Sequence, residues 1–212
     1  MSRQDRKAGA RGAYHHGNLR EALIQAALVL IAERGLAGFA VAELARAVGV
    51  SSAAPYRHFR DRDAVVAEVA RRGFEQLATE MRAAADAPGG NAVTALERCA
   101  QAHLSFAARE KPVYAAMFEP DFPVSSHPEL SRARDAAFAV LRRMAHVACD
   151  QSRAPTRPPA LMVALHIWSM THGIAALFVS HDGAGQLAMT PAELLEAGLL
   201  VYLQSLQLPP GS

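Results

Sequence analysis

The sequence lacks the residue patterns that most enzymes and metalloproteins need. No nucleophile is spaced with a general base, no carboxylates are paired for acid–base work, and no phosphate-cradling glycine loop or cofactor fingerprint occurs. Only two cysteines are present, Cys99 and Cys149, and their spacing does not suit a metal site. Each lies in an apolar helical run, so we expect reduced core cysteines and no disulfide. The sequence therefore supports neither catalysis, nor a metal, nor a cofactor.

The histidines are the one feature that leaves a chemical role open. The chain has nine of them, namely His15, His16, His58, His103, His127, His146, His166, His172 and His181. None forms a His-x3-His pair or a Glu-x-x-His motif, which are common spacings of metal ligands. We expect most of them to face solvent or to be hydrogen-bonded in the core. The alternative is a helical-bundle enzyme or metal-binding protein that uses these side chains.

Secretory and β-strand patterns are also missing. The first residues, MSRQDRKAGARG, are polar and contain no apolar segment of a secretory signal, so we expect a cytoplasmic protein. No segment alternates convincingly between polar and apolar residues, whereas helical spacing recurs along the chain. The sequence predicts an all-α fold of about nine helices, with its clearest loop at residues 86–91.

One long helical segment carries no formal charge. The stretch from Ala160 to Ser180 is long enough to span a bilayer. It contains polar residues such as Ser169 and Thr171, however, and no second stretch of this kind exists. A helix that is apolar all round is equally typical of a buried central helix or a subunit interface. We favour a buried helix or a subunit interface over a membrane span, and we expect no membrane partner.

Charge is unevenly distributed along the chain. Residues 1–72 hold twelve Lys and Arg against seven Asp and Glu, a balance of +5, whereas residues 73–212 have a balance of −3. A basic amino-terminal third beside a weakly acidic remainder is typical of a polyanion-binding module attached to a second domain. A difference of a few charges also arises by chance, so the charge alone favours nucleic acid only weakly.

The stretch from Val41 to Phe59 predicts two short helices around a tight turn. Val41, Leu44 and Val48 recur at helical spacing, and Gly49 follows where a helix end favours a left-handed residue. Ser51 or Ser52 could cap the next helix. This arrangement is a helix-turn-helix, whose second helix lies in the DNA major groove.

The same residues resemble the TetR family of bacterial transcriptional regulators. The resemblance rests on a helix ending AERG, then Phe39, then VAELARAVGVSSAAPYRHFRDRDAV, and it covers roughly residues 17–68. The rest of the chain is similar in length and helical layout. The segment from Trp168 to Gly173, WSMTHG, also resembles the Trp…His-Gly signature of one subgroup's carboxy-terminal domain.

The resemblance implies a non-enzymatic homodimer that binds a palindromic DNA operator and is released by a small, mainly apolar effector. It implies three parts: a flexible basic arm at residues 1–13, a DNA-binding domain at residues 14–60, and a ligand-binding and dimerisation domain at residues 61–212. Carried over residue by residue, the expected DNA contacts are Ser51, Ser52, Ala53, Tyr56, Arg57, His58 and Arg62. Their chemistry is suitable, because Arg57 can bind guanine through two hydrogen bonds and Ala53 can touch a thymine methyl.

Two residues depart from the family pattern. Ala40 stands where the family often has Ser or Thr, so the second helix loses a side-chain cap. Pro55 replaces a usual leucine inside the recognition helix, where it removes a hydrogen bond to the Ser51 carbonyl. It is also expected to push Ala54 away from helical backbone angles. We therefore expect a late or distorted recognition helix, which leaves the alignment of its residues with individual bases open.

Two further sets of residues follow from the resemblance and from helix spacing. Trp168 and His172 are four residues apart and share a helix face, either as a packed pair in the core or as the lining of an effector cavity. The full set of candidate effector contacts is Met117, Phe118, Phe138, Met144, Trp168, His172 and Phe178. The candidate dimer contacts, on the last two long helices, are Leu165, Ile174, Leu194, Leu195, Leu199, Tyr202 and Leu206.

Overall fold

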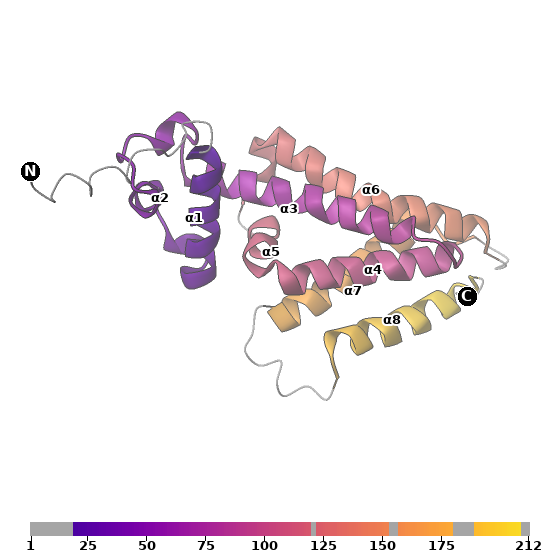
Figure 1. Cartoon of the computed structure of the whole chain (residues 1–212). Coiled ribbons are helices and arrows are strands. Elements are labelled where there is room, and N and C mark those ends of the chain that lie inside the picture. Colours follow the sequence, from indigo (N-terminus) through magenta and orange to yellow (C-terminus); the bar gives the residue numbers. More distant parts are fainter. Residues whose placement is uncertain (1–18, 120–121, 153–156, 180–188, 209–212) are drawn as a thin grey trace, which may run out of the picture. The chain divides into compact units, whose positions relative to one another are not determined.

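Helices are the only regular secondary structure in the described part of this computed structural model. It comprises residues 19–119, 122–152, 157–179 and 189–208, which divide into two compact units between Val66 and Ala67. The predicted arm at residues 1–13 lies outside these ranges. Within them, the structure confirms the all-α prediction (Figure 1).

The smaller unit contains the predicted helix-turn-helix. Its elements are α1 (Leu19–Arg34), η1 (Leu36–Gly38), α2 (Val41–Val48) and η2 (Pro55–Arg57), of which the two η elements are 3-10 helices. Side chains from α1 and α2 form an apolar core, in which Leu23, Leu44 and Phe59 are almost completely buried. This burial fixes α2 and the segment after it as a packed module.

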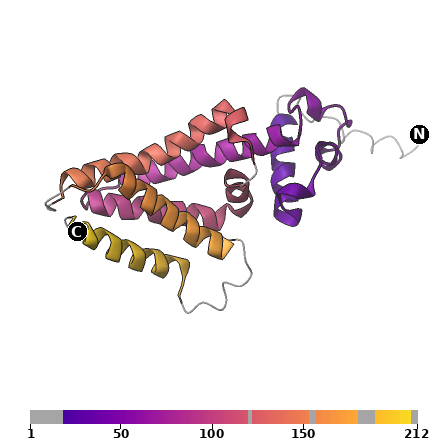
Figure 2. The same cartoon turned by 180° about the vertical axis from the view of Figure 1, so that it is seen from behind.

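The larger unit is a helical bundle. Helix α3 (Arg62–Ala85) begins in the smaller unit and continues into the larger one, which also holds α4 (Ala92–Arg109), α5 (Lys111–Met117), η3 (Val124–Ser126), α6 (Pro128–Asp150), α7 (Ala160–Val179) and α8 (Pro191–Ser205). Helices α4, α6, α7 and α8 pack against one another, and α6 and α7 lie side by side in the view from behind (Figure 2).

Side chains in the flanking loops cap several of these helices. Asn91 accepts hydrogen bonds from the backbone N–H groups of Val93 and Thr94 at the start of α4. Thr190 and Glu193 form a capping box at the start of α8, as the Thr-Pro sequence predicts. These caps satisfy amide groups that a helix start otherwise leaves without partners.

The described residues contain eight α-helices, one fewer than predicted. The missing helix is the recognition helix, because residues 51–59 form only the 3-10 turn η2. Pro55 has no N–H to continue an α-helix from the Ser51 carbonyl, which accepts the Ala54 N–H in a tight turn instead. The eight α-helices that are present account for the rest of the predicted number.

Helix α7 is the described helix whose length and apolar composition would suit a membrane span. It packs against α4, α6 and α8, and Val163, Ala164 and Ile167 on it are fully buried. Only 33% of its apolar segment is buried within the single chain, so the helix is buried on one side and exposed on the other.

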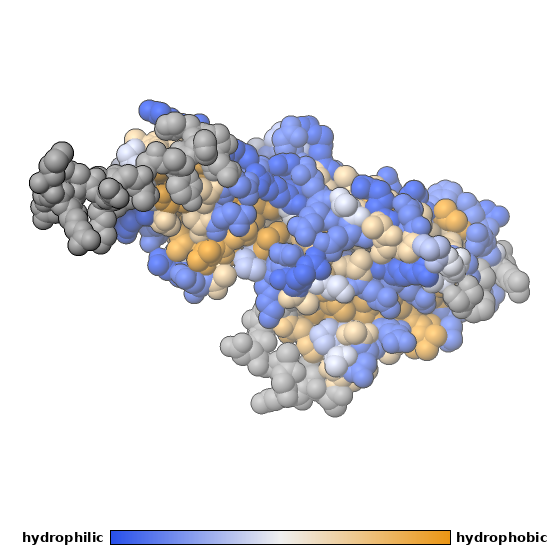
Figure 3. Space-filling model, viewed as in Figure 1, coloured by the Kyte–Doolittle hydropathy of each residue, from blue (hydrophilic) through white to orange (hydrophobic). Residues whose placement is uncertain are grey.

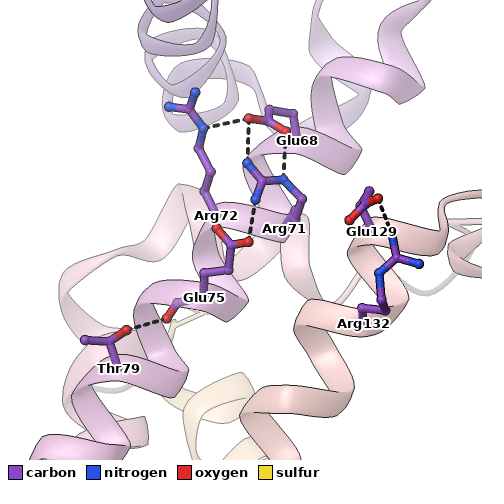
Figure 4. Close-up of polar contacts among 7 residues, drawn as sticks. All are labelled: Glu68, Arg71, Arg72, Glu75, Thr79, Glu129 and Arg132. Carbon is purple, nitrogen blue, oxygen red and sulfur yellow. Dashed lines mark hydrogen bonds and ion pairs between the residues drawn. The ribbon is translucent and has the colours of Figure 1, made fainter.

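A group of charged residues stabilises α3 just beyond the point where the units divide (Figure 4). Glu68, only 8% exposed, accepts hydrogen bonds from Arg71 at 2.9 Å and from Arg72 at 2.8 Å. Arg71 also pairs with Glu75 one turn further on, and these contacts raise its pKa, mainly through the hydrogen bond to Glu68. Pairs three and four residues apart stabilise a helix, so α3 is reinforced where it enters the larger unit.

Candidate DNA-binding and effector-binding sites

A left-handed glycine ends α2 and turns the chain into the predicted recognition segment. Gly49 has φ 75° and ψ 32°, and its N–H donates to the Arg46 carbonyl. The N–H of Val50 reaches back to the Ala45 carbonyl at 3.0 Å. These two bonds form a Schellman motif, which confirms the predicted role of Gly49.

The recognition segment is a series of tight turns. Ala54, Arg57 and His58 each donate a backbone hydrogen bond to the carbonyl three residues earlier, and Phe59 donates to the Pro55 carbonyl at 2.9 Å. No serine side chain caps the segment, whose N-cap is Ala54. The expected displacement of Ala54 from helical angles is wrong, since Ala54 has φ −63° and ψ −41°. Pro55 is instead the first residue of η2, where its missing N–H leaves no internal bond unmade.

The predicted DNA contacts in this segment lie together on its solvent side. The six exposed residues are Ser51, Ser52, Ala53, Tyr56, Arg57 and His58. Pro55 and Phe59 point the other way and are buried, so they anchor the segment to the smaller unit. The Tyr56 ring is 54% exposed, so it is accessible to a partner. The segment thus presents hydroxyl, aromatic, guanidinium and imidazole groups on one short, tightly bonded element.

Arg62 stands apart from these six residues because its side chain is already engaged. Its Nε donates to the Leu36 carbonyl at 2.9 Å, and its Nη2 donates to the same oxygen. The guanidinium also lies 5.5 Å from the centre of the Phe39 ring, and Nη1 pairs with Asp63. Arg62 therefore ties the start of α3 to η1, whatever contact it also makes with DNA.

The start of α2 shows how the chain compensates for Ala40. The Ala40 side chain accepts no hydrogen bond, as its chemistry requires, but the Glu43 carboxylate accepts the Ala40 N–H at 2.9 Å. Arg34 of α1 donates to the same carboxylate at 2.9 Å. The hydrogen bond from Ala40, followed by that from Arg34, lowers the pKa of Glu43. Half of a capping box is therefore kept, and it also joins α2 to α1.

A cluster of aromatic and imidazole rings lies inside the larger unit, and we call it the ring cluster. Its members are Phe74 (α3), His103 (α4), Tyr114 (α5), Phe118 (directly after α5), Phe138 (α6), Trp168 and His172 (both α7). Phe118 is central, with its ring centroid 4.3 Å from that of His172 and 5.5 Å from that of Phe74. Trp168 lies 4.7 Å from the ring of His103 and packs edge-on against Phe138.

A chain of hydrogen bonds crosses the ring cluster. The Tyr114 hydroxyl lies 3.1 Å from Nε2 of His103 and 2.8 Å from Nδ1 of His172. Burial lowers the pKa of His103 to about 3, with a further contribution from His172, and burial also lowers the pKa of His172. Burial raises the pKa of Tyr114. All three groups are therefore uncharged at neutral pH, in a cluster that has no charged member.

The ring cluster contains four of the seven predicted effector contacts. Phe118, Phe138, Trp168 and His172 belong to it. Met117 packs instead against Gly73 of α3. Met144 and Phe178 are half-buried on α6 and α7, and within the described residues Phe178 makes no ring contact with the cluster.

Sequence reasoning missed His103, Tyr114 and Phe74 as members. They come from three helices, and Tyr114 is 58 residues from His172, so no local spacing could have joined them.

The predicted dimer contacts on α8 need a correction. Leu195 and Leu199 are 0% and 2% exposed within the single chain, so their side chains face the protomer's own core. Ile174 of α7 is buried as well. Leu194, Tyr202 and Leu206 are half-buried, and Leu165 is exposed. Helix α8 has leucines on both faces, so residue spacing does not show which face is buried. The buried face is the one that carries Leu195 and the leucines at four-residue spacing after it.

Within the described ranges, no three His, Cys, Asp or Glu side chains lie close enough to hold a metal ion. Cys99 and Cys149 are buried free thiols, as predicted. His15, His16 and His181 lie outside the described residues.

Comparison with known proteins relates both units to one group of proteins. The family model described as bacterial regulatory proteins of the tetR family matches residues 23–69. The model described as the tetracyclin repressor-like carboxy-terminal domain matches residues 96–202. No curated protein matches the chain.

Several solved structures are similar over almost the whole chain. A protein of unknown function from Rhodococcus sp. RHA1 is 28% identical, with a TM-score of 0.78, covering 92% of this chain and 99% of that one. The TetR-family regulator PfmR from Thermus thermophilus is 20% identical, with a TM-score of 0.68 and coverages of 86% and 97%. The fatty acid degradation regulator FadR from Bacillus halodurans is 14% identical, with a TM-score of 0.71 and coverages of 90% and 97%. At these identities the last two show a shared fold.

Proposed function

Because this chain belongs to the TetR family of transcriptional regulators, whose members bind DNA and are not enzymes, we propose that it is an effector-controlled repressor. In this proposal it binds a palindromic operator in the bacterial cytoplasm as a homodimer. A small, mainly apolar molecule releases it from the DNA. The subgroup suggested by Trp168, His172 and Gly173 stays a prediction.

The observation that carries the proposal is the exposed side of the recognition segment. Six predicted contact residues face solvent there, while Pro55 and Phe59 hold the segment from behind. Arg57 would read guanine, the serines and Ala53 would meet base edges or phosphates, and Tyr56 and His58 would bind the backbone. A short 3-10 turn presents fewer residues to the groove than an α-helix, so we expect base reading to depend on Arg57 and the turn residues before Pro55.

The surface of α7 supports the homodimer. Every fourth residue along it is exposed, in the order Leu161, Leu165, Ser169, Gly173 and Leu177, and we call this row the α7 outer stripe. A Cβ atom at Gly173 would meet nothing within 4 Å, so the stripe has room for close approach of another helix. Leu200 and Val201 of α8 are exposed too, and apolar side chains gather at the surface around α8 (Figure 3). A second copy packed on these faces would bury them in a four-helix interface.

A dimer built in this way would bind a palindromic operator. Two recognition segments related by a two-fold axis would enter successive major grooves, with half-site centres ~34–36 Å apart. The effector would act through α3, which starts beside the recognition segment and carries Phe74 of the ring cluster. It must bind the released state more tightly than the DNA-bound state, by a differential of ~1–3 kcal/mol or more.

Recovery of bound genomic DNA tests the proposal. The purified protein is mixed with sheared DNA from its source organism, and the retained fragments are sequenced. We expect enrichment of a few intergenic fragments that share one palindrome. Retention of fragments without a shared sequence, or no retention at low salt, would contradict the proposed function.

A further inference from the structure

An open groove lies at the surface of the larger unit, where the second half of α6 meets the start of α7, and we call it the α6–α7 groove. Its volume is about 480 Å³, which lies within the roughly 300–1,000 Å³ range of small-molecule sites. It is lined by Ala139, Arg142, Arg143, His146 and Val147 of α6 and by Ala160 and Leu161 of α7. None of these residues belongs to the ring cluster, so the groove is a separate candidate site.

Helix spacing brings the polar lining residues together. Ala139, Arg142, Arg143 and His146 follow one another at intervals of three, one and three residues, so they share one face of α6. The two arginines and the histidine are exposed. The remaining lining residues, on both helices, are aliphatic. The groove therefore combines an aliphatic surface with cationic side chains.

Two of the polar lining residues already have carboxylate partners. Nη2 of Arg143 lies 3.5 Å from Oδ1 of Asp86, the residue directly after α3. Nδ1 of His146 lies 3.0 Å from Asp150, whose carboxylate is also 3.1 Å from Arg157. These carboxylates balance two of the positive charges at the groove.

Arg142 has no such partner. It is exposed, and in the part of the chain that the structure describes it makes no hydrogen bond or ion pair. Its guanidinium can bind a carboxylate through two parallel hydrogen bonds. The first turn of α7 contains no acidic residue, so the positive end of that helix also favours a negative charge nearby. One uncompensated arginine matches a singly charged carboxylate better than a phosphate monoester, whose charge is about −1.5 to −2 at neutral pH.

We propose that the α6–α7 groove binds an amphipathic carboxylate. The head group forms two hydrogen bonds with Arg142, and the aliphatic chain lies against Val147 and Leu161. The head group also competes with Asp86 for Arg143, because an exposed ion pair of this length is weak and easily exchanged. The inference goes beyond the proposed function, since it concerns a second site outside the ring cluster.

Three probes with the same chain separate the contributions of head-group charge and apolar contact. Decanoate carries one negative charge, decanol carries none, and decyl phosphate carries nearly two. Isothermal titration calorimetry with the full-length protein measures the affinity of each. We expect saturable binding of decanoate that weakens as the salt concentration rises, because the arginines are exposed. Decanol should bind more weakly and without salt dependence, and decyl phosphate should bind no more tightly than decanoate.

Variants at exposed positions locate the binding site. Arg142→Gln should weaken decanoate binding roughly fivefold or more and leave decanol binding as it was. Val147→Asp should also weaken decanoate binding, because it brings a carboxylate into the groove. Arg132→Gln is the matched control, since it removes an exposed arginine of α6 outside the groove, and it should leave decanoate binding unchanged.

Asp86→Asn should strengthen binding. The change removes the carboxylate that pairs with Arg143, so decanoate should bind roughly two- to fivefold more tightly. A general loss of structure could not produce this gain. An unchanged affinity would disprove the exchange at Arg143.

Three results would overturn the inference. They are no saturable binding of decanoate below its micelle concentration, decanoate binding that Arg142→Gln or Val147→Asp leaves unchanged, and tighter binding of decyl phosphate than of decanoate. Operator binding is measured separately on recovered DNA. A protein that binds the operator but not decanoate disproves only the groove site, whereas decanoate binding without sequence-specific DNA binding disproves only the repressor.

Discussion

Gly73 on α3 lies so close to Met117 on α5 that a Cβ atom at Gly73 would come within 2.5 Å of the Met117 sulfur. The same Cβ atom would also be 2.5 Å from a methyl group of Val113. Helix α5 carries Tyr114 and leads directly into Phe118, so it connects the ring cluster with α3. An effector that displaces Phe118 or Met117 must therefore move the surface on which α3 rests.

The first prediction concerns this contact. Gly73→Ala should lower the free energy of unfolding by about 1–3 kcal/mol, the usual cost of an extra methyl group in a packed core. Urea unfolding at neutral pH measures this loss.

A double-mutant cycle identifies the contact responsible. In the Met117→Ala background, Gly73→Ala should lower the free energy of unfolding by less than it does in the wild type, because the Met117 sulfur is absent. Gly198→Ala is a control on α8, where the added Cβ would press mainly on the flexible Met170 sulfur at 2.8 Å. Strict additivity of Gly73→Ala and Met117→Ala would show that this packing does not limit α3.

The second prediction separates two arginines of the DNA-binding unit. Arg57→Ala should weaken operator binding by ~1–3 kcal/mol and relax one base preference, without loss of stability, because its side chain is exposed. Arg62→Ala should weaken binding to all DNA alike and also lower the free energy of unfolding by about 1–3 kcal/mol, because the Leu36 carbonyl loses its donor. Salt-titrated anisotropy and urea unfolding check both variants.

Arg82→Ala removes an exposed charge near the end of α3 and provides the baseline for both measurements. Wild-type operator affinity of the Arg57 variant would disprove the reading role of that residue. Wild-type stability of the Arg62 variant would show that the bond to Leu36 has no structural role.

The third prediction places the dimer interface on the α7 outer stripe. Leu165→Glu should convert the dimer into a folded monomer, because a carboxylate would be buried in the interface without a partner. Leu199→Ala should instead lower stability by ~2–5 kcal/mol, because it leaves a cavity inside each protomer. Sedimentation velocity and urea unfolding distinguish the two outcomes.

Val29→Glu controls for the added charge, since Val29 is exposed on α1 and outside the proposed interface. A Leu165→Glu protein that still sediments as a dimer would exclude the α7 outer stripe as the interface.

The fourth prediction is a loss of stability in acid. Burial lowers the pKa of His103 in the native protein to about 3, from its ordinary value of 6.5. Between these two pH values the unfolded chain binds a proton at His103 that the native protein does not bind. The native protein therefore has its full stability above about pH 6.5. As the pH falls towards 3, the free energy of unfolding should decrease by about 1.4 kcal/mol per pH unit for this one proton. Urea unfolding at a series of pH values measures the slope.

Removing the imidazole should flatten that slope. His103→Phe is expected to be less stable at neutral pH, because Tyr114 loses a partner, but its stability should depend less on pH between about 6.5 and 3. His58→Phe, a change at an exposed histidine of the smaller unit, should keep the wild-type slope. An unchanged slope in His103→Phe would show that other groups cause the acid sensitivity.

The helix-turn-helix was predictable because its signals are local. Gly49 adopts the left-handed conformation that its position after α2 predicts, and Asp61 caps α3 through the Ala64 N–H. The proline was recognised as a disturbance, but its result, a 3-10 turn with Ala54 still in helical conformation, depends on how tightly the buried Pro55 and Phe59 hold the turn.

The ring cluster and the buried face of α8 were predictable only in part. Trp168 and His172 share a helix and were found together, whereas Tyr114 and His103 join them only through tertiary packing. The two faces of α8 are both leucine-rich, so spacing could not decide which one is buried. Only the burial of Leu195 and Leu199 settles this.

A footprint of the palindrome recovered from genomic DNA, together with the stoichiometry of the complex, tests whether two chains bind one operator. We expect two chains per duplex and protection of two half-sites one helical turn apart, ~34–36 Å between centres, with the protection weakened in Arg57→Ala. One protected half-site bound by one chain, or a footprint that Arg57→Ala leaves intact, would contradict this expectation.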